Sequence, residues 1–110
     1  MNQKEFLDAV RTLELELFSK DFNKWVNQQS DDEKKNIRNL RTEISTYRSQ
    51  LETNKLKVLA DMLDQLSPQL TKGIDDLTQA IDDMNNFVKT VELVEKIIGL
   101  VARIATLVAA

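Results

Sequence analysis

Residues 70–91 read LTKGIDDLTQAIDDMNNFVKTV, and their apolar side chains recur at alternating steps of four and three residues. That spacing brings one apolar side chain to the same helix face at every turn, which is the heptad seam of helices that pack side by side. The stripe consists of Leu70, Ile74, Leu77, Ile81, Met84, Val88 and Val91. The stretch therefore predicts a long amphipathic helix whose core face carries these residues.

A second seam precedes the first and ends at Leu66, directly before Ser67 and Pro68. Proline lacks an amide hydrogen and fits the first position of a helix, while the residue before it is pushed away from helical geometry. We therefore expect a helix to begin here, with Ser67 as its N-cap, and the two seams to form a tight antiparallel coiled-coil hairpin. The preceding seam consists of Ile37, Leu40, Ile44, Tyr47 and Leu51, and resumes through Leu56, Leu59, Leu63 and Leu66.

A further helix start is predicted at Ser30, which is followed three residues later by Glu33, the spacing of a capping box. The polar residues before Ser30 interrupt the apolar pattern, so an earlier helix must end there. The resulting fold class is all-α. We expect one domain, 1–110, in which three long helices over about 3–28, 31–66 and 68–110 form an up-down-up antiparallel bundle.

Composition supports long helices and restricts the chemistry. The 110-residue chain holds only two Gly and one Pro, so the turn residues that a β-sheet requires are scarce. It has no Cys and no His, which removes thiolate and imidazole chemistry, the disulfide, and the usual metal ligands. We therefore expect no catalytic residue, no cofactor, no metal site and no small-molecule substrate.

Charge and the N-terminal sequence restrict the partners and the compartment. The net charge of −3 disfavours nucleic acid, whose binding domains are normally strongly basic. The first residues, MNQKEF, are polar and lack the apolar core of a secretory signal, so a cytoplasmic location is expected.

Two periodic sets of charges occur in the chain. Basic residues at seven-residue intervals flank the second seam, where they could make ion pairs with Glu14, Glu16 or Asp21, or contact an anionic surface. Doubled acids form the other set, but a straight helix cannot wrap a Ca²⁺ ion with enough oxygen ligands, so a solvated face is expected. The sets are Lys34, Arg41, Arg48 and Lys55, and Asp75, Asp76, Asp82 and Asp83.

Residues 91–110, VELVEKIIGLVARIATLVAA, are the most apolar part of the chain. At 100° per residue the polar positions fall within an arc of about 100°, so the remaining arc needs burial on several sides. Three environments could bury this segment: a transmembrane span, which Arg103 disfavours, a membrane surface, and other helices. We favour other helices, because a bundle of this topology brings Phe18, Phe22 and Trp25 beside this segment.

Two apolar surfaces are predicted to lack cover within the chain. One is a stripe that lies off the seam on the C-terminal helix, and a symmetric oligomer would bury it. The other is the tip of the hairpin, over 59–77, beyond the reach of the first helix. The residues expected to make these contacts are Leu93, Ile97, Leu100, Ile104 and Leu107 on the stripe, and Leu59, Leu63, Leu66 and Leu70 at the tip.

The leading hypothesis is a non-catalytic helical interaction or assembly protein that forms a homo-oligomer or binds partner helices of another protein. The alternative is a membrane-active protein that releases the amphipathic helix 91–110 onto a lipid surface. No motif in the chain is specific enough to name a family.

Overall fold

The structure, a computed structural model, describes residues 2–53 and 60–109, except for the side chains of residues 3, 60 and 107–109. The described part is all-helical and contains five helices where three were expected. They are α1 (Gln3–Leu17), α2 (Lys20–Asn27), α3 (Asp31–Thr53), α4 (Ala60–Asp83) and α5 (Phe87–Ala109).

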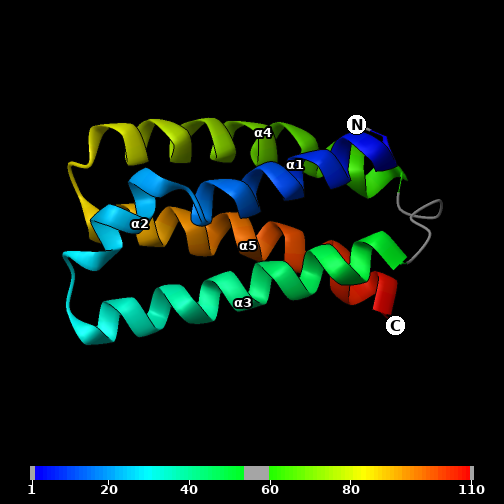
Figure 1. Cartoon of the computed structure of the whole chain (residues 1–110). Helices are drawn as coiled ribbons and strands as arrows, with labels where there is room; N and C mark the ends of the chain where they lie inside the picture. The colour runs from blue at the N-terminus through cyan, green and yellow to red at the C-terminus, as the bar shows by residue number, and fades with distance from the viewer. Residues whose placement is uncertain (1, 54–59, 110) are drawn as a thin grey trace.

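The four long helices lie around one core as a bundle, and the short α2 closes one end of it (Figure 1). In the ring, α1 packs beside α3 and α4, and α5 packs beside the same two helices. The chain direction reverses from α1 to α3, from α3 to α4 and from α4 to α5, so α3 and α5 are parallel neighbours. The α1–α3 edge and the α4–α5 edge of the ring are therefore on opposite sides of the molecule.

The expected first helix breaks after Leu17. Ser19 has an extended backbone, and its hydroxyl oxygen accepts a hydrogen bond from the amide of Phe22 at 3.3 Å, which makes it the N-cap of α2. The capping serine of the next helix occupies its expected place, since Ser30 Oγ accepts from the Glu33 amide at 3.3 Å. A serine therefore begins each of these two helices.

The expected last helix also breaks, between Asp83 and Phe87. Met84 ends α4 with a φ of 50°, in the left-handed region that non-glycine residues rarely adopt. Asn86 then caps α5 by accepting from the amide of Lys89 at 3.1 Å. The break shifts the apolar register by one residue, so Phe87 is buried while Met84 and Val88, predicted as seam residues, are exposed.

The predicted hairpin at Ser67 and Pro68 is wrong, because α4 continues through both residues. Pro68 lies on the exposed side of the helix, whereas Leu66 and Leu70 are buried on the other. An interior proline costs about 3 kcal/mol. Burial of large aliphatic side chains stabilises by roughly 1.5–3 kcal/mol each, which outweighs that cost when several share one face.

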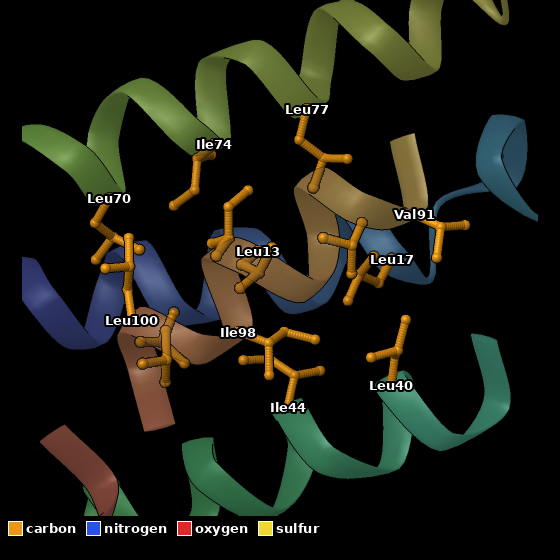
Figure 2. Packing of buried hydrophobic residues seen from close by; sticks show 14 of the residues in the cluster. Leu13, Leu17, Leu40, Ile44, Leu70, Ile74, Leu77, Val91, Ile98 and Leu100 are labelled. Carbon is orange, nitrogen blue, oxygen red and sulfur yellow. The ribbon is translucent and has the colours of Figure 1, made fainter. Parts of the chain in front are cut away.

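The expectation of an uncovered hairpin tip is also wrong for the described residues, because α4 continues through Ser67 and Pro68. Because α4 begins at Ala60 and runs back beside α1 and α5, its apolar face joins the common core. Figure 2 shows side chains from α1, α3, α4 and α5 meeting there. The buried residues of this face are Leu63, Leu66, Leu70, Ile74, Leu77 and Ile81, while Leu59 lies outside the described residues.

Candidate interaction surface

The C-terminal stripe is covered within the single chain. Ile97, Leu100 and Ile104 are at most 7% exposed, and Leu93 is partly buried against the core. The side chain of Leu107 lies outside the described residues. The cover comes from α4, which approaches α5 closely at Gly73. The argument that this stripe lacks an intrachain partner is therefore wrong, and with it the reason for expecting self-association there.

Two of the three aromatic residues expected beside the C-terminal segment belong to the core. Phe22 and Trp25 pack against Phe87, with ring centroids 6.3 and 5.2 Å away. The expected partner segment was wrong because α1 runs antiparallel to α5, which brings α2 to the first turn of α5 rather than beside its apolar middle. This aromatic group closes the end of the bundle and leaves no free ring face for a ligand.

The third aromatic residue, Phe18, is 54% exposed at the end of α1. Leu15, three residues earlier, is 71% exposed, and the two side chains lie on neighbouring positions of the same helix surface. Among the described side chains, the large hydrophobic ones that are exposed are Leu15, Phe18, Met84 and Val88.

Arg41 of α3 holds the α1–α2 break together from outside. Its Nε donates to the carbonyl oxygen of Leu17 at 2.7 Å, and its guanidinium carbon lies 5.2 Å from the Phe18 ring centroid and 5.8 Å from that of Phe22. The positive group therefore satisfies a carbonyl at the negative end of α1 and stacks on two rings. Burial lowers the pKa of Arg41 from its usual value.

A shallow, open hollow of about 710 Å³ lies beside Phe18 on the outer surface of α3. Its rim combines one aromatic ring, two guanidinium groups and a row of hydroxyls. Several hydroxyls are already engaged; the Thr42 hydroxyl, for example, donates to the Arg38 carbonyl at 3.0 Å. The lining residues are Phe18, Arg38, Arg41, Thr42, Ser45, Thr46, Ser49 and Gln50. The hollow therefore presents apolar and cationic groups rather than free hydroxyls.

The basic residues of α3 divide into a paired and an unpaired set. Arg48 Nε forms an ion pair with Glu14 of α1 at 3.1 Å, as the sequence predicted for this flank, and the hydrogen bond that Arg48 donates to Glu14 raises the pKa of Arg48. Toward the start of the helix, Lys34 and Arg38 make no ion pair with any described residue. Lys55, the last of the series, lies outside the described residues.

An exposed apolar pair and two guanidinium groups lie near the break between α1 and α2. Phe18, Arg38 and Arg41 line the same hollow, and Leu15 lies three residues before Phe18 on the same helix surface. We call the surface formed by Leu15, Phe18, Arg38 and Arg41 the Phe18 patch. It combines apolar area with two positively charged side chains, which suits an apolar segment that carries acidic side chains.

The remaining groups that could carry chemistry are engaged or dispersed. Burial raises the pKa of Tyr47, and its hydroxyl donates to Glu43 Oε1 at 3.0 Å. Asp76 pairs with Lys72 of its own helix at 2.8 Å. The described residues contain no group of three or more carboxylates placed to hold a metal ion.

From the sequence, Phe18 was expected to be an interaction residue beside 91–110, and Arg41 to belong to a basic series that forms ion pairs or contacts an anionic surface. Leu15 and Arg38 were not singled out, and the exposure of Met84 and Val88 was missed. Leu15 could have been found, because it lies about 160° from the core stripe of its helix when placed at 100° per residue. The exposure of Met84 and Val88 depends on the break at 84–86, which the regular heptad spacing concealed.

Comparisons of the chain with protein families, with curated protein sequences and with solved structures find no match. Of the described helices, none combines the length and the apolar character needed to cross a membrane.

Proposed function

We propose that this chain is a non-catalytic helical interaction protein that binds a protein segment of apolar and acidic character through the Phe18 patch. The observation that carries the proposal is the exposure of Leu15 and Phe18, with Phe18 beside Arg38 and Arg41, while most of the large apolar side chains that the structure describes are buried. Aromatic residues and arginine are enriched among the side chains that dominate binding energy at protein interfaces.

Two side chains of the patch, Phe18 and Arg41, are already held in place, which lowers the cost of binding a partner. Arg41 is held by the Leu17 carbonyl, and Phe18 is stacked on Arg41, so neither side chain must be ordered on binding. Ordering a flexible side chain at an interface costs about 0.5–1.5 kcal/mol. Arg38, by contrast, is exposed and has no ion-pair partner among the described residues, so it is available to an incoming carboxylate.

The lipid-surface alternative requires α5 to leave the bundle. Apart from the exposed Val88 and the partly buried Leu93, the large apolar side chains described for this helix are buried, and Val94, Val101 and Ile104 have no exposed surface. Release would bring all of them into water before they reached a membrane. The burial of these side chains therefore counts against the lipid-surface alternative. The test below includes that alternative.

The test is a titration of the full chain with a designed amphipathic peptide of Leu and Glu, followed by calorimetry. The control is the same peptide with Lys in place of Glu. We expect binding of the Glu peptide alone, weakened at least tenfold by Leu15→Asn/Arg38→Ala, since an interfacial charge pair and a large apolar contact are lost together. The matched control variant is Lys72→Ala, on the opposite side of the ring.

Binding of neither peptide, or equal binding of both, would overturn the proposal. Phosphatidylserine vesicles are added in a parallel light-scattering measurement. Association with vesicles without binding of the Glu peptide would replace the proposed function by the lipid-surface alternative.

A further inference from the structure

The exposed apolar residues form two groups of opposite charge. Leu15 and Phe18 belong to the Phe18 patch, whose two charged members, Arg38 and Arg41, are bases. Met84 and Val88 stand where α4 turns into α5, within residues 82–92, which hold three acids and one base. We call the second surface, formed by Asp82, Asp83, Met84, Val88 and Glu92, the Met84 corner; all five are exposed.

The two surfaces cannot meet within one molecule. The Phe18 patch lies on the α1–α3 edge of the ring and the Met84 corner belongs to α4 and α5, which form the opposite edge. The core that separates them is closed: Leu13, Ile44, Leu77 and Val101 are fully buried. Any contact between patch and corner must therefore join two copies of the chain.

The Met84 corner is held in place by local hydrogen bonds. The amide of Met84 donates to the Ala80 carbonyl at 3.0 Å, and Asn86 caps the following helix. Together with the left-handed conformation of Met84, these bonds turn both apolar side chains outward. An exposed methionine is also well suited to irregular apolar surfaces, because its thioether side chain is flexible and polarizable.

We propose that the protein segment bound by the Phe18 patch is the Met84 corner of a second copy of this chain. The inference rests on the proposed function and names its partner. In this contact Leu15 and Phe18 pack on Met84 and Val88, while Arg38 faces Asp82, Asp83 and Glu92. Because the two surfaces differ, the contact is heterologous, and each added copy leaves one patch and one corner free.

This geometry predicts an open series of oligomers rather than a closed two-fold dimer. Only four large apolar side chains and a few exposed charge pairs take part, so the association should be weak and sensitive to salt. Sedimentation velocity on the wild type at low ionic strength should show the mean mass rising with concentration past that of a dimer. About 0.5 M NaCl should reverse most of the rise, because the Debye length is then only a few ångströms.

Two variants with one inactive surface each provide the decisive test. The patch variant is Leu15→Asn/Arg38→Ala, and the corner variant is Met84→Gly/Val88→Asn. All four residues are exposed, and glycine accepts the φ of Met84, so both variants should fold, as circular dichroism checks. Each variant alone should be monomeric. Their mixture should form a one-to-one dimer and nothing larger, since only one intact patch and one intact corner remain.

Two other outcomes would overturn the inference of contact between the patch and the corner. A corner variant that still self-associates would overturn the inference in favour of patch-to-patch contact. A wild type that stays monomeric at high micromolar concentration and low salt would also overturn it. In that case the proposed function is decided separately by the titration with the Glu peptide, in which no second copy is needed.

Discussion

The chain interrupts its helices at two places that the heptad pattern marks as continuous, and the two breaks are held by different means. The break between α1 and α2 has a local cap, Ser19, and a long-range brace, Arg41, which reaches in from α3. The break between α4 and α5 has a local cap, Asn86, and a residue in left-handed conformation, Met84, and the first residue of α5, Phe87, packs on Phe22 and Trp25 of α2. One break is therefore braced by a charged hydrogen bond from a distant helix, while the other combines a local turn with aromatic packing.

Removing the long-range brace should have the largest effect. Arg41→Ala removes a charged hydrogen bond to the Leu17 carbonyl and the stacking on Phe18 and Phe22. Hydrogen bonds to charged groups contribute about 1.5–3 kcal/mol, so we expect a loss of roughly 2 kcal/mol in urea denaturation. Arg38→Ala, three residues earlier and exposed, should cost almost nothing. Equal losses in the two variants would mean that the break does not depend on Arg41.

The position of α5 after the second break can be tested with the two glycines. A Cβ at Gly73 would lie 2.8 Å from Ile97 Cγ1, whereas a Cβ at Gly99 would meet nothing within 4 Å. Overpacking costs typically 1–3 kcal/mol, while Gly→Ala in a helix gains up to about 1 kcal/mol. Gly73→Ala should therefore lower the free energy of unfolding and Gly99→Ala should raise it. The same sign for both would place α5 in a different register.

Removing the local cap of the second break should have a moderate effect. Asn86→Ala deletes the side-chain oxygen that accepts from the Lys89 amide, and loss of an N-cap costs about 1 kcal/mol. Asn85→Ala is the matched control, since Asn85 is exposed and no side-chain hydrogen bond is found for it. Thermal melts of the two variants should differ by that amount. If Asn85→Ala is the more damaging change, α5 is capped by a different residue.

Replacing Met84, whose backbone is left-handed, by glycine should stabilise the folded state slightly. A non-glycine residue in this region costs roughly 1–2 kcal/mol, and part of the gain from Met84→Gly is offset by the greater freedom of glycine in the unfolded chain. We expect a net gain of about 0.5 kcal/mol in chemical denaturation. A loss of stability would show that the half-exposed Met84 side chain contributes more by packing than its conformation costs.

The α1–α3 contact between Arg11 and Glu52, away from the first break, should weaken in acid. A hydrogen bond from Arg11 lowers the pKa of Glu52 below its usual 4.5. The carboxylate therefore stabilises the folded state above that pH, and the contribution disappears as the pH falls through the lowered pKa. Because the pair is exposed, the effect is small. Comparing wild type with Glu52→Gln between neutral pH and pH near 3, by urea denaturation, should show the difference only at the higher pH.

The sequence predicted the class of fold and many of the core positions correctly. The apolar stripes at Ile37, Ile44, Leu70 and Leu77 are buried as expected, because periodic apolar residues leave water together on one helix face. The cap at Ser30 was also predictable, since it needs only a hydroxyl and an amide three residues apart. Phe18 was expected to lie beside residues 91–110, and its exposure could not be predicted, because that depends on where α1 stops.

The helix boundaries were the main error, and the errors have one cause. A heptad pattern shows which residues are apolar. It does not reveal a break that shifts the register by one residue, as at Met84 and Phe87. A proline indicates a local penalty, but it does not reveal whether burial elsewhere on the helix outweighs it, as around Pro68. With the turns misplaced, the neighbours of each helix were misplaced too.

Local sequence alone determined that this chain forms amphipathic helices, that one of them is capped by Ser30, and which chemistry is absent from its side chains. Only the tertiary structure decided which apolar stripes are covered. The C-terminal stripe at Ile97 and Leu100 is buried by α4, while Leu15 and Phe18 remain exposed beside the bases of α3. The reason is physical: amphipathicity is a property of one helix, but exposure depends on the partners that surround it, and those follow from the direction and connection of every other helix.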